Sequence, residues 1–334
     1  MKLDRSQAEH LLASIQGRKV AVLGDLMLDE YLFGEVNRIS PEAPVPIVHI
    51  QRERAVLGGA ANVAANLRAI GAEPLLLGTL RDDAAGLRLR GLLEAQGIGS
   101  QHLVVDPDRA TIIKTRVIGQ QQQMLRIDRE DSGELSDATA LALTDRLEWI
   151  LDSACALIVS DYAKGVVGPV VMEAVRELCQ KRGLPWIVDP KPAHRSLYRG
   201  ATLITPNTKE LTELTNQPAR SEADVARAGR GLAAALELGG LLVTRSEKGM
   251  ALFTAETSHQ EPWFIPTEAR EVFDVSGAGD TVIAVFSAAV GAGADWKAAA
   301  MLANAAAGVV VAKVGTATAS PAEILEHYQE QEAI

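Results

Sequence analysis

Short apolar runs alternate with longer stretches of helical periodicity along most of this chain. The apolar runs predict β-strands at residues 19–23, 74–80, 156–160, 186–188, 202–205 and 241–244. Helical spacing of apolar residues predicts helices at 59–70, 83–96, 138–152, 169–182, 222–238, 278–292, 295–314 and 321–331. Strands that alternate with helices are typical of a central, mostly parallel sheet with helices on both faces, so we expect an α/β fold.

Two segments interrupt this alternation. Residues 30–52 contain three prolines, and residues 111–128 hold two alternating runs separated by a polar stretch, so both predict extended strands. We expect a small β-strand lid, inserted in a single domain of residues 1–334, that excludes water from a site beneath it. The alternative is a pair of ordinary surface hairpins.

Composition narrows the class of protein. The 334 residues are 47% hydrophobic and carry a formal net charge of −10, which argues against nucleic acid or an anionic membrane as partner. The apolar stretch at 298–312 is interrupted by Asn304 and Gly308, so no membrane span is expected. Cys155 and Cys179 lie in apolar or helical surroundings and predict two buried, reduced thiols, which fits a cytoplasmic protein.

A Gly-rich turn before the helix predicted at 278–292 carries the strongest chemical signal. It reads Asp274-Val-Ser-Gly277-Ala278-Gly279-Asp280. Small residues let an anion approach the unpaired N–H groups of a helix N-terminus. A carboxylate there repels such an anion, and a general base explains Asp280: it would accept a proton while the amides of 277–279 stabilise a transferring phosphoryl group. The alternative is that Asp280 only complements the helix dipole.

Two other helix starts hold polar residues. Gly58-Gly59-Ala-Ala-Asn62 allows a close approach to a ligand and offers an amide to hydroxyl groups, although a Gly-Gly pair is also a simple turn. Asn207 and Glu210 are oxygen donors that suit Mg²⁺, directly or through water, and they equally fit an N-cap with its partner three residues later.

Other nucleotide and metal motifs are missing from the sequence. It has no G-x-x-x-x-G-K-[ST] loop, the six histidines are scattered, and the first predicted strand does not end in a Gly-x-Gly turn. Asp29 follows that strand, where a carboxylate accepts hydrogen bonds from sugar hydroxyls or serves as a turn residue.

The order and spacing of these motifs resemble the ribokinase-like (PfkB) carbohydrate kinases over roughly residues 18–320. Within that family, residues 38–46, 160–165, 189–191 and 243–247 are similar to the D-glycero-β-D-manno-heptose 7-phosphate kinases. The resemblance implies a ribokinase-like fold and, with ATP and Mg²⁺, phosphorylation of the anomeric hydroxyl of heptose 7-phosphate for ADP-heptose and lipopolysaccharide core synthesis. Met27 departs from the Asn of ribose-using relatives, which argues against ribose.

The resemblance also assigns roles. It implies Asp280 as catalytic base with Gly277, Ala278 and Gly279 as anion hole, Asn207 and Glu210 as the Mg²⁺ and phosphate motif, Thr244, Ser246, Gly249 and Asn304 near the nucleotide, and Asp29, Gly58, Gly59 and Asn62 as sugar contacts. The phosphate at the far end of the sugar needs cations to bind it. We expect Lys164, Lys191 and Arg116 to do so, and Arg38 and Arg126 are further candidates.

Further expectations concern partners and alternatives. We expect a homodimer through the lid, because exposed β-edges pair readily. In bifunctional heptose kinases a nucleotidyltransferase domain follows the kinase, and we expect a separate protein to perform that later step here. A kinase for another sugar, sugar phosphate or nucleoside, and a non-catalytic sugar-phosphate sensor, stay open as alternatives.

Overall fold

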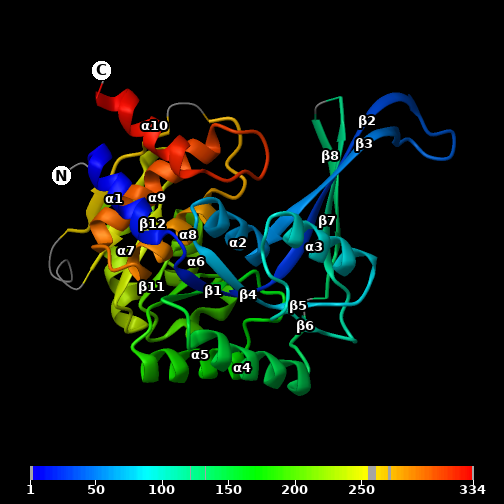
Figure 1. Cartoon of the computed structure of the whole chain (residues 1–334). Helices are drawn as coiled ribbons and strands as arrows, with labels where there is room; N and C mark the ends of the chain where they lie inside the picture. Colours follow the sequence, from blue (N-terminus) through cyan, green and yellow to red (C-terminus); the bar gives the residue numbers. More distant parts are fainter. Residues whose placement is uncertain (1–2, 121, 132, 255–260, 270–271, 333–334) are drawn as a thin grey trace.

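The computed structural model describes residues 3–120, 122–131, 133–254, 261–269 and 272–332. An eight-stranded sheet forms the centre, in the order β14-β13-β12-β11-β10-β9-β1-β4 (Figure 1). Its parallel strands are β1 (Lys19–Gly24), β4 (Glu73–Leu77), β9 (Ala156–Ser160), β10 (Trp186–Asp189), β11 (Leu203–Ile204) and β12 (Gly240–Thr244). At one edge, β13 (Met250–Phe253) and β14 (Trp263–Ile265) continue it antiparallel. The expected mostly parallel sheet is confirmed.

Helices cover both faces of this sheet. On one face lie α1 (Arg5–Ile15), α2 (Ala60–Ala69), α8 (Ala278–Gly291), α9 (Trp296–Val311) and α10 (Pro321–Glu332), and on the other α4 (Asp137–Leu151), α5 (Pro169–Arg182), α6 (Thr208–Thr215) and α7 (Glu222–Ala235). Strand β1 shows why: Val20 and Val22 enter one core, while Ala21 and Leu23 enter the other, because successive side chains point to opposite faces.

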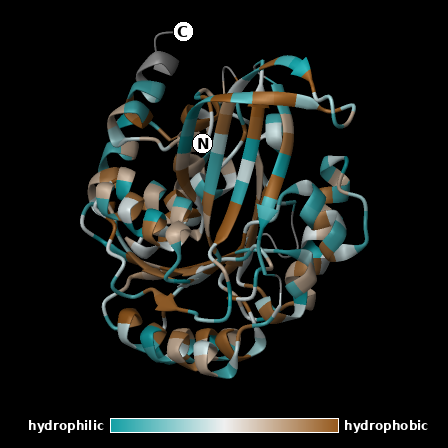
Figure 2. Ribbon diagram, turned by 90° about the vertical axis from the view of Figure 1, so that its right-hand side faces the viewer, coloured by the Kyte–Doolittle hydropathy of each residue, from teal (hydrophilic) through white to brown (hydrophobic). Residues whose placement is uncertain are grey.

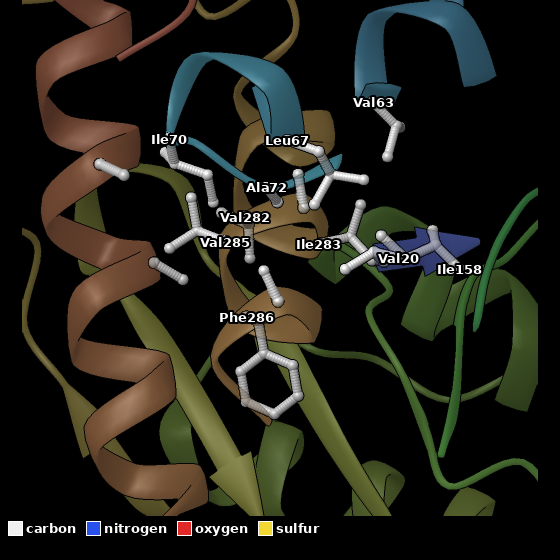
Figure 3. Packing of buried hydrophobic residues seen from close by; sticks show 14 of the residues in the cluster. Val20, Val63, Leu67, Ile70, Ala72, Ile158, Val282, Ile283, Val285 and Phe286 are labelled. Carbon is white, nitrogen blue, oxygen red and sulfur yellow. The ribbon is translucent and has the colours of Figure 1, made fainter. Parts of the chain in front are cut away.

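The core beneath α2 and α8 holds the elements that carry the candidate site. Figure 3 shows Leu67 of α2 and Ile283 of α8 close to Val20 and Ile158 of the central strands. Each of these four side chains is fully buried. Burial of a Leu or Ile side chain stabilises a fold by roughly 1.5–3 kcal/mol, so this packing fixes the N-termini of both helices against the sheet.

A second sheet projects from the body next to α3 (Ala84–Ala95) (Figure 1). It consists of β2 (Leu26–Ile39), β3 (Pro46–Gly59), β7 (Ile112–Gly119) and β8 (Gln122–Arg129), in the order β3-β2-β7-β8. This confirms the extended strands that the sequence predicts at 30–52 and 111–128, of which Gln121 lies outside the described residues. Strands β2 and β3 extend further toward the body than predicted. We call this sheet the lid.

Some elements differ from the prediction. The single strand expected at 74–80 is divided at Gly78 into β4 and β5 (Thr79–Leu80), and β5 pairs with β6 (Val104–Val105) in a small sheet. The helix expected to reach residue 314 ends at Val311, and the 3₁₀ turns η1 (Pro192–Tyr198) and η2 (Ser246–Lys248) and strands β13 and β14 were not predicted.

Two predictions about composition are also tested. Both thiols are free and Cys179 is buried, as expected, whereas Cys155 is only half-buried and not fully buried as predicted. Among the described residues, no helix is both long and apolar enough to cross a membrane.

Candidate active site

The Gly-rich turn opens α8, as the sequence predicts. Gly277 is the N-cap and has a φ of +82°, in the left-handed region that favours glycine. Helix α8 begins at Ala278, and among the described residues no atom outside the adjoining backbone of the helix lies within 4 Å of the position that a Cβ of Gly279 would occupy. Within the described part of the chain, the amides of Gly279 and Asp280 form no hydrogen bond. Two N–H donors at the helix N-terminus are therefore available to an anion.

Asp280 is a buried carboxylate held by two donors from distant parts of the chain. It is 6% exposed; the amide of Asn62 donates to Oδ2 at 2.6 Å, and the hydroxyl of Tyr162 donates to Oδ1 at 3.0 Å. Burial raises the pKa of Asp280 to about 6; the two hydrogen bonds and the positive charge of Lys191 oppose this rise, and the negative charge of Asp29 adds to it. Such a carboxyl is suited to accept a proton near neutral pH.

Helix α2 brings Asn62 to this position, and two glycines make the approach possible. A Cβ at Gly58 would lie 2.6 Å from Oδ2 of Asp29. Gly59 has a φ of +58°, and a Cβ there would collide with the carbonyl oxygen of Asp25. Both glycines are therefore needed for the turn from β3 into α2, as well as lying beside the candidate site.

A second polar contact joins α2 to α8 one turn further along. The hydroxyl of Thr281 donates to Oδ1 of Asn66 at 2.7 Å, and the amide of Asn66 donates to the carbonyl of Asn62 at 2.9 Å. All three side chains are buried. This chain of hydrogen bonds fixes the relative position of the two helix N-termini, and with it the contact between Asn62 and Asp280.

Sequence reasoning gave no role to Tyr162, although it lies in a motif that carries the family resemblance. Its loop is held by the buried carboxylate of Asp25, which accepts hydrogen bonds from the backbone amides of Tyr162 at 2.9 Å, Lys164 at 3.0 Å and Val166 at 3.1 Å. The available signal was the position of Asp25 directly after β1, because a carboxylate there can order the loop that follows a neighbouring strand.

A pocket of about 340 Å³ lies between the lid and the N-termini of α2 and α8. Its lining consists of Met27, Asp29, Tyr31, Gly58, Gly59, Asn62, Lys114, Arg116, Arg126, Tyr162, Ser276, Gly277, Asp280 and Thr316. Arg116 donates to Oδ1 of Asp29 at 2.7 Å across this pocket wall. The pocket thus brings together the predicted base, part of the predicted anion hole and most of the predicted sugar contacts.

The other two predicted sugar-phosphate cations have carboxylate partners. Nζ of Lys164 lies 2.7 Å from Glu130, and Nζ of Lys191 lies 2.6 Å from Glu210. Neither lysine lines the pocket around Asp280, although Lys191 lies 5.4 Å from the centre of the Tyr162 ring. The structure places Lys191 between the base and the motif predicted for Mg²⁺.

Asn207 and Glu210 form a capping box at the start of α6. Oδ1 of Asn207 accepts from the amides of Lys209 and Glu210, and Oε2 of Glu210 accepts from the amide of Asn207 at 3.0 Å. The capping alternative is therefore present, and it leaves a metal role open. In the described part of the chain, no group of three or more His, Cys, Asp or Glu side chains is placed to hold a metal ion.

Three of the residues predicted to lie near the nucleotide, Thr244, Ser246 and Gly249, lie from the end of β12 to the start of β13, and the fourth, Asn304, lies in α9. Thr244 ends β12 and forms an isolated bridge with Asn207, and Ser246 begins η2. Gly249 has a φ of +77°, and a Cβ there would collide with the carbonyl of Ile265, so this turn requires glycine. The amide of Asn304, buried in α9, donates to the carbonyl of Pro266 at 2.8 Å.

A parallel sheet with a lid, and a carboxylate at a Gly-rich helix start, define a ribokinase-like sugar kinase. Residues 18–323 match the family model for the pfkB family carbohydrate kinase, and the chain belongs to this family. The resemblance drawn from the sequence motifs is thereby confirmed.

Two bifunctional proteins illustrate the match in sequence. The bifunctional protein HldE of Desulfatibacillum aliphaticivorans is 46% identical over 316 residues, which cover 94% of this chain and 63% of that protein. HldE of Caulobacter vibrioides is 47% identical over 316 residues, 94% of this chain and 64% of that protein. This chain thus spans less than two thirds of the length of these relatives.

Solved structures show the same fold at low sequence identity. Ribokinase of Arabidopsis thaliana, complexed with ribose and ATP, matches with a TM-score of 0.73 and 21% identity, covering 94% of this chain and 99% of that one. Phosphofructokinase-2 of Escherichia coli, in complex with potassium, matches with a TM-score of 0.75 and 18% identity, covering 95% and 100%.

Proposed function

We propose that this chain transfers the γ-phosphoryl group of ATP to the anomeric hydroxyl of D-glycero-β-D-manno-heptose 7-phosphate, giving the 1,7-bisphosphate. The observation that carries the chemistry is the buried carboxylate of Asp280, with a pKa of about 6, next to open amides at the start of α8. The heptose assignment rests on the sequence motifs and on the similarity to HldE proteins.

In this proposal Asp280 is the general base. An anomeric hydroxyl is more acidic than an ordinary alcohol, so a carboxylate can accept its proton as the hydroxyl attacks. The amides of Gly279 and Asp280, together with the turn at Gly277 and Ala278, would stabilise the charge on the transferring phosphoryl group. Asp29 and Asn62, which line the same pocket, would bind sugar hydroxyls.

The residues at the strand ends fit a nucleotide with Mg²⁺, which would supply charge neutralisation to the phosphates. Both oxygens of Glu210 already accept hydrogen bonds, from the Asn207 amide and from Lys191. Contact with Mg²⁺ through water therefore fits better than direct coordination, and Mg²⁺ usually keeps several waters. We assign Thr244, Ser246, Gly249 and Asn304 to the nucleotide side on the family resemblance.

The test measures ATP-dependent phosphorylation of heptose 7-phosphate by the wild type and by Asp280→Asn, with ADP formation as the readout. Ribose and fructose 6-phosphate serve as competing acceptors. We expect turnover of heptose 7-phosphate and a fall in kcat of about 10²–10⁴ in the variant. The matched control is Asp137→Asn, because Asp137 also lies in the first turn of a helix, α4, away from the pocket. If Asp280 only complemented a helix dipole, both variants would behave alike.

Other outcomes separate the alternatives. Preference for another acceptor would retain the kinase mechanism and reject the heptose assignment. Binding of sugar phosphates without turnover of any acceptor would instead support the sensor.

We also propose that the lid pairs with a second copy of the chain. Within the described residues, β3 and β8 are the open edges of the lid sheet, and each described residue of β8 is exposed. Leu125 and Ile127 of β8 are 48% and 52% exposed, and Figure 2 shows apolar segments along the strands of the lid. Open edges with apolar side chains favour pairing between chains.

A further inference from the structure

The face of the lid that meets the pocket carries more positive than negative side chains. Side chains alternate along β2, and Met27, Asp29 and Tyr31 all line the pocket, so odd-numbered positions in this part of β2 point toward it. Residues in register with these positions on neighbouring strands share the same face. Strand pairing therefore decides which charges from three other strands surround a bound molecule.

Three successive register rows cross this face. The first is Val56, Asp29, Lys114 and Asp128; the second is Arg54, Tyr31, Arg116 and Arg126; the third is Arg52, Phe33, Ile118 and Gln123. Together they hold five cations and two carboxylates, a net charge of +3 in a chain whose formal net charge is −10. Of the charged residues in these rows, Asp29, Lys114, Arg116 and Arg126 line the pocket, so that wall carries a net charge of +2. Positive charge on one pocket wall of an acidic protein indicates an anionic ligand.

The second row is an arginine row around Tyr31. The Arg116 guanidinium lies 5.3 Å from the centre of the Tyr31 ring, and Arg126 forms a two-pronged contact with Asp128 at 2.8 and 2.9 Å. Nη1 of Arg54 comes within 3.9 Å of the position that a Cβ of Gly315 would occupy, next to the pocket residue Thr316. All three arginines thus lie on the wall or the rim of the pocket.

The existing ion pairs orient these side chains without using all their donors. A guanidinium has five N–H donors. Arg126 uses Nε and Nη2 for Asp128, and Arg116 uses Nη1 for Asp29, which leaves further donors on each. The side chain of Arg126 is 49% exposed and that of Arg116 is 22% exposed, so both are accessible. Guanidinium groups suit phosphate because they can donate two parallel hydrogen bonds.

The spacing along the lid fits a sugar phosphate. Two residues along a strand span about 6.8 Å, so the arginine row lies one such step beyond Asp29, on the side away from the body (Figure 1). A sugar with its reacting hydroxyl at Asp280 and its other hydroxyls at Asp29 would therefore place its far end at the arginine row.

We propose that Arg54, Arg116 and Arg126 form a subsite for a phosphate monoester on the acceptor, at the end opposite to the hydroxyl that is phosphorylated. The inference rests on the proposed kinase function and names the chemistry that selects the acceptor. It assigns the distal phosphate to the lid, because Arg116 and Arg126 line the pocket around Asp280, whereas Lys164 and Lys191, the favoured candidates at the strand exits, do not.

The experiment compares phosphorylated and unphosphorylated acceptors. Arg54→Gln and Arg126→Gln are assayed with heptose 7-phosphate and with the free heptose, and with fructose 6-phosphate and fructose. The matched control is Arg129→Gln, which removes the same charge from the same strand as Arg126 but on the opposite face of the lid, in register with Ile113. Melting temperatures confirm that each variant is folded.

We expect KM for the phosphorylated acceptor to rise about 10- to 100-fold in each subsite variant, with a much smaller change in kcat, since a hydrogen bond between charged groups is lost. KM for the free sugar should not change, and Arg129→Gln should behave as the wild type. Equal effects on both kinds of acceptor, or no effect on either, would overturn the inference.

The two proposals fail in different ways. If fructose 6-phosphate or another sugar phosphate is the preferred acceptor and its KM depends on Arg54 and Arg126, the subsite stands and the heptose assignment fails. If heptose 7-phosphate is phosphorylated with an unchanged KM in both variants, the function stands and the subsite fails. If no acceptor is phosphorylated, calorimetric titration decides: binding that requires the phosphate and is lost in Arg126→Gln supports the subsite, and binding that does not require it rejects the subsite.

Discussion

Replacing Tyr162 by Phe should move the acid limb of the pH profile for kcat. The Tyr162 hydroxyl donates to Oδ1 of Asp280 at 3.0 Å and lowers the pKa of that carboxyl, which burial raises to about 6. Phe keeps the ring and removes the donor, so the ionised form of Asp280 loses one hydrogen bond. Tyr162 itself stays protonated, because burial and the charge of Asp280 raise its pKa far above the usual value.

The magnitude follows from the strength of that contact. A hydrogen bond to a charged group contributes about 1.5–3 kcal/mol, and 1.36 kcal/mol corresponds to one pKa unit. The pKa of Asp280 should therefore rise from about 6 to roughly 7–8. The ionised fraction at pH 7 then falls from about 0.9 to between about 0.5 and 0.1. We expect kcat at pH 7 to drop by roughly 2- to 10-fold and to recover near pH 9.

Other charges around Asp280 do not change in this variant. Asp29 and Asp189 disfavour its ionised form, whereas Lys191 favours it. Steady-state kinetics from pH 5 to pH 9.5 measure the acid limb.

The matched control is Tyr328→Phe, because Tyr328 is buried in α10 and its hydroxyl has no hydrogen-bond partner among the described residues. A uniform loss of kcat at every pH, with an unmoved acid limb, would refute the inference that the Tyr162 hydroxyl lowers the pKa of Asp280.

Two further predictions concern stability and assembly. Because the folded-state pKa of Asp280 lies above its ordinary value of 3.8, its stabilising contribution is present below about pH 4 and is lost as the pH rises through about 6. In urea unfolding, the free energy of unfolding of the wild type should fall by roughly 1–2 kcal/mol between pH 5 and pH 8 relative to that of Asp280→Asn. A difference in unfolding free energy between the two proteins that does not change with pH would contradict this. Sedimentation should show a wild-type dimer and a monomer for Ile127→Lys, since a charge on the exposed β8 of the lid blocks edge pairing; a monomeric wild type would reject the lid dimer.

Local patterns predicted the framework of the fold well. The strand at 156–160 and the helix at 169–182 match their bounds in the structure, because each is an uninterrupted periodic segment with clear ends. The division at Gly78 was missed because a close approach causes it: a Cβ there would lie 2.5 Å from the carbonyl oxygen of Gly24. Strands β13 and β14 were missed because both are short: β13 has four residues that are all buried, so its side chains do not alternate between apolar and polar, and β14 has three residues at the edge of the sheet.

The candidate site also has features that local sequence motifs predict and features that they do not. The Gly-rich turn at 277–279 and the capping pair Asn207 and Glu210 are local motifs, and the structure places both at helix starts as expected. The partners of Asp280 are not local: Asn62 is 218 residues away and Tyr162 is 118 residues away. No pattern along the chain predicts which hydroxyl or amide meets a carboxylate across such distances.

The sequence by itself determined the alternation of strands and helices, the family, and the position of a carboxylate at a Gly-rich helix start, because periodicity and capping depend on neighbours within a few residues. Only the tertiary structure decided the surroundings of that carboxylate and the row of Arg54, Arg116 and Arg126 on the lid. Strand register and helix packing bring these charges together, and they depend on how distant segments bury their apolar faces against one another.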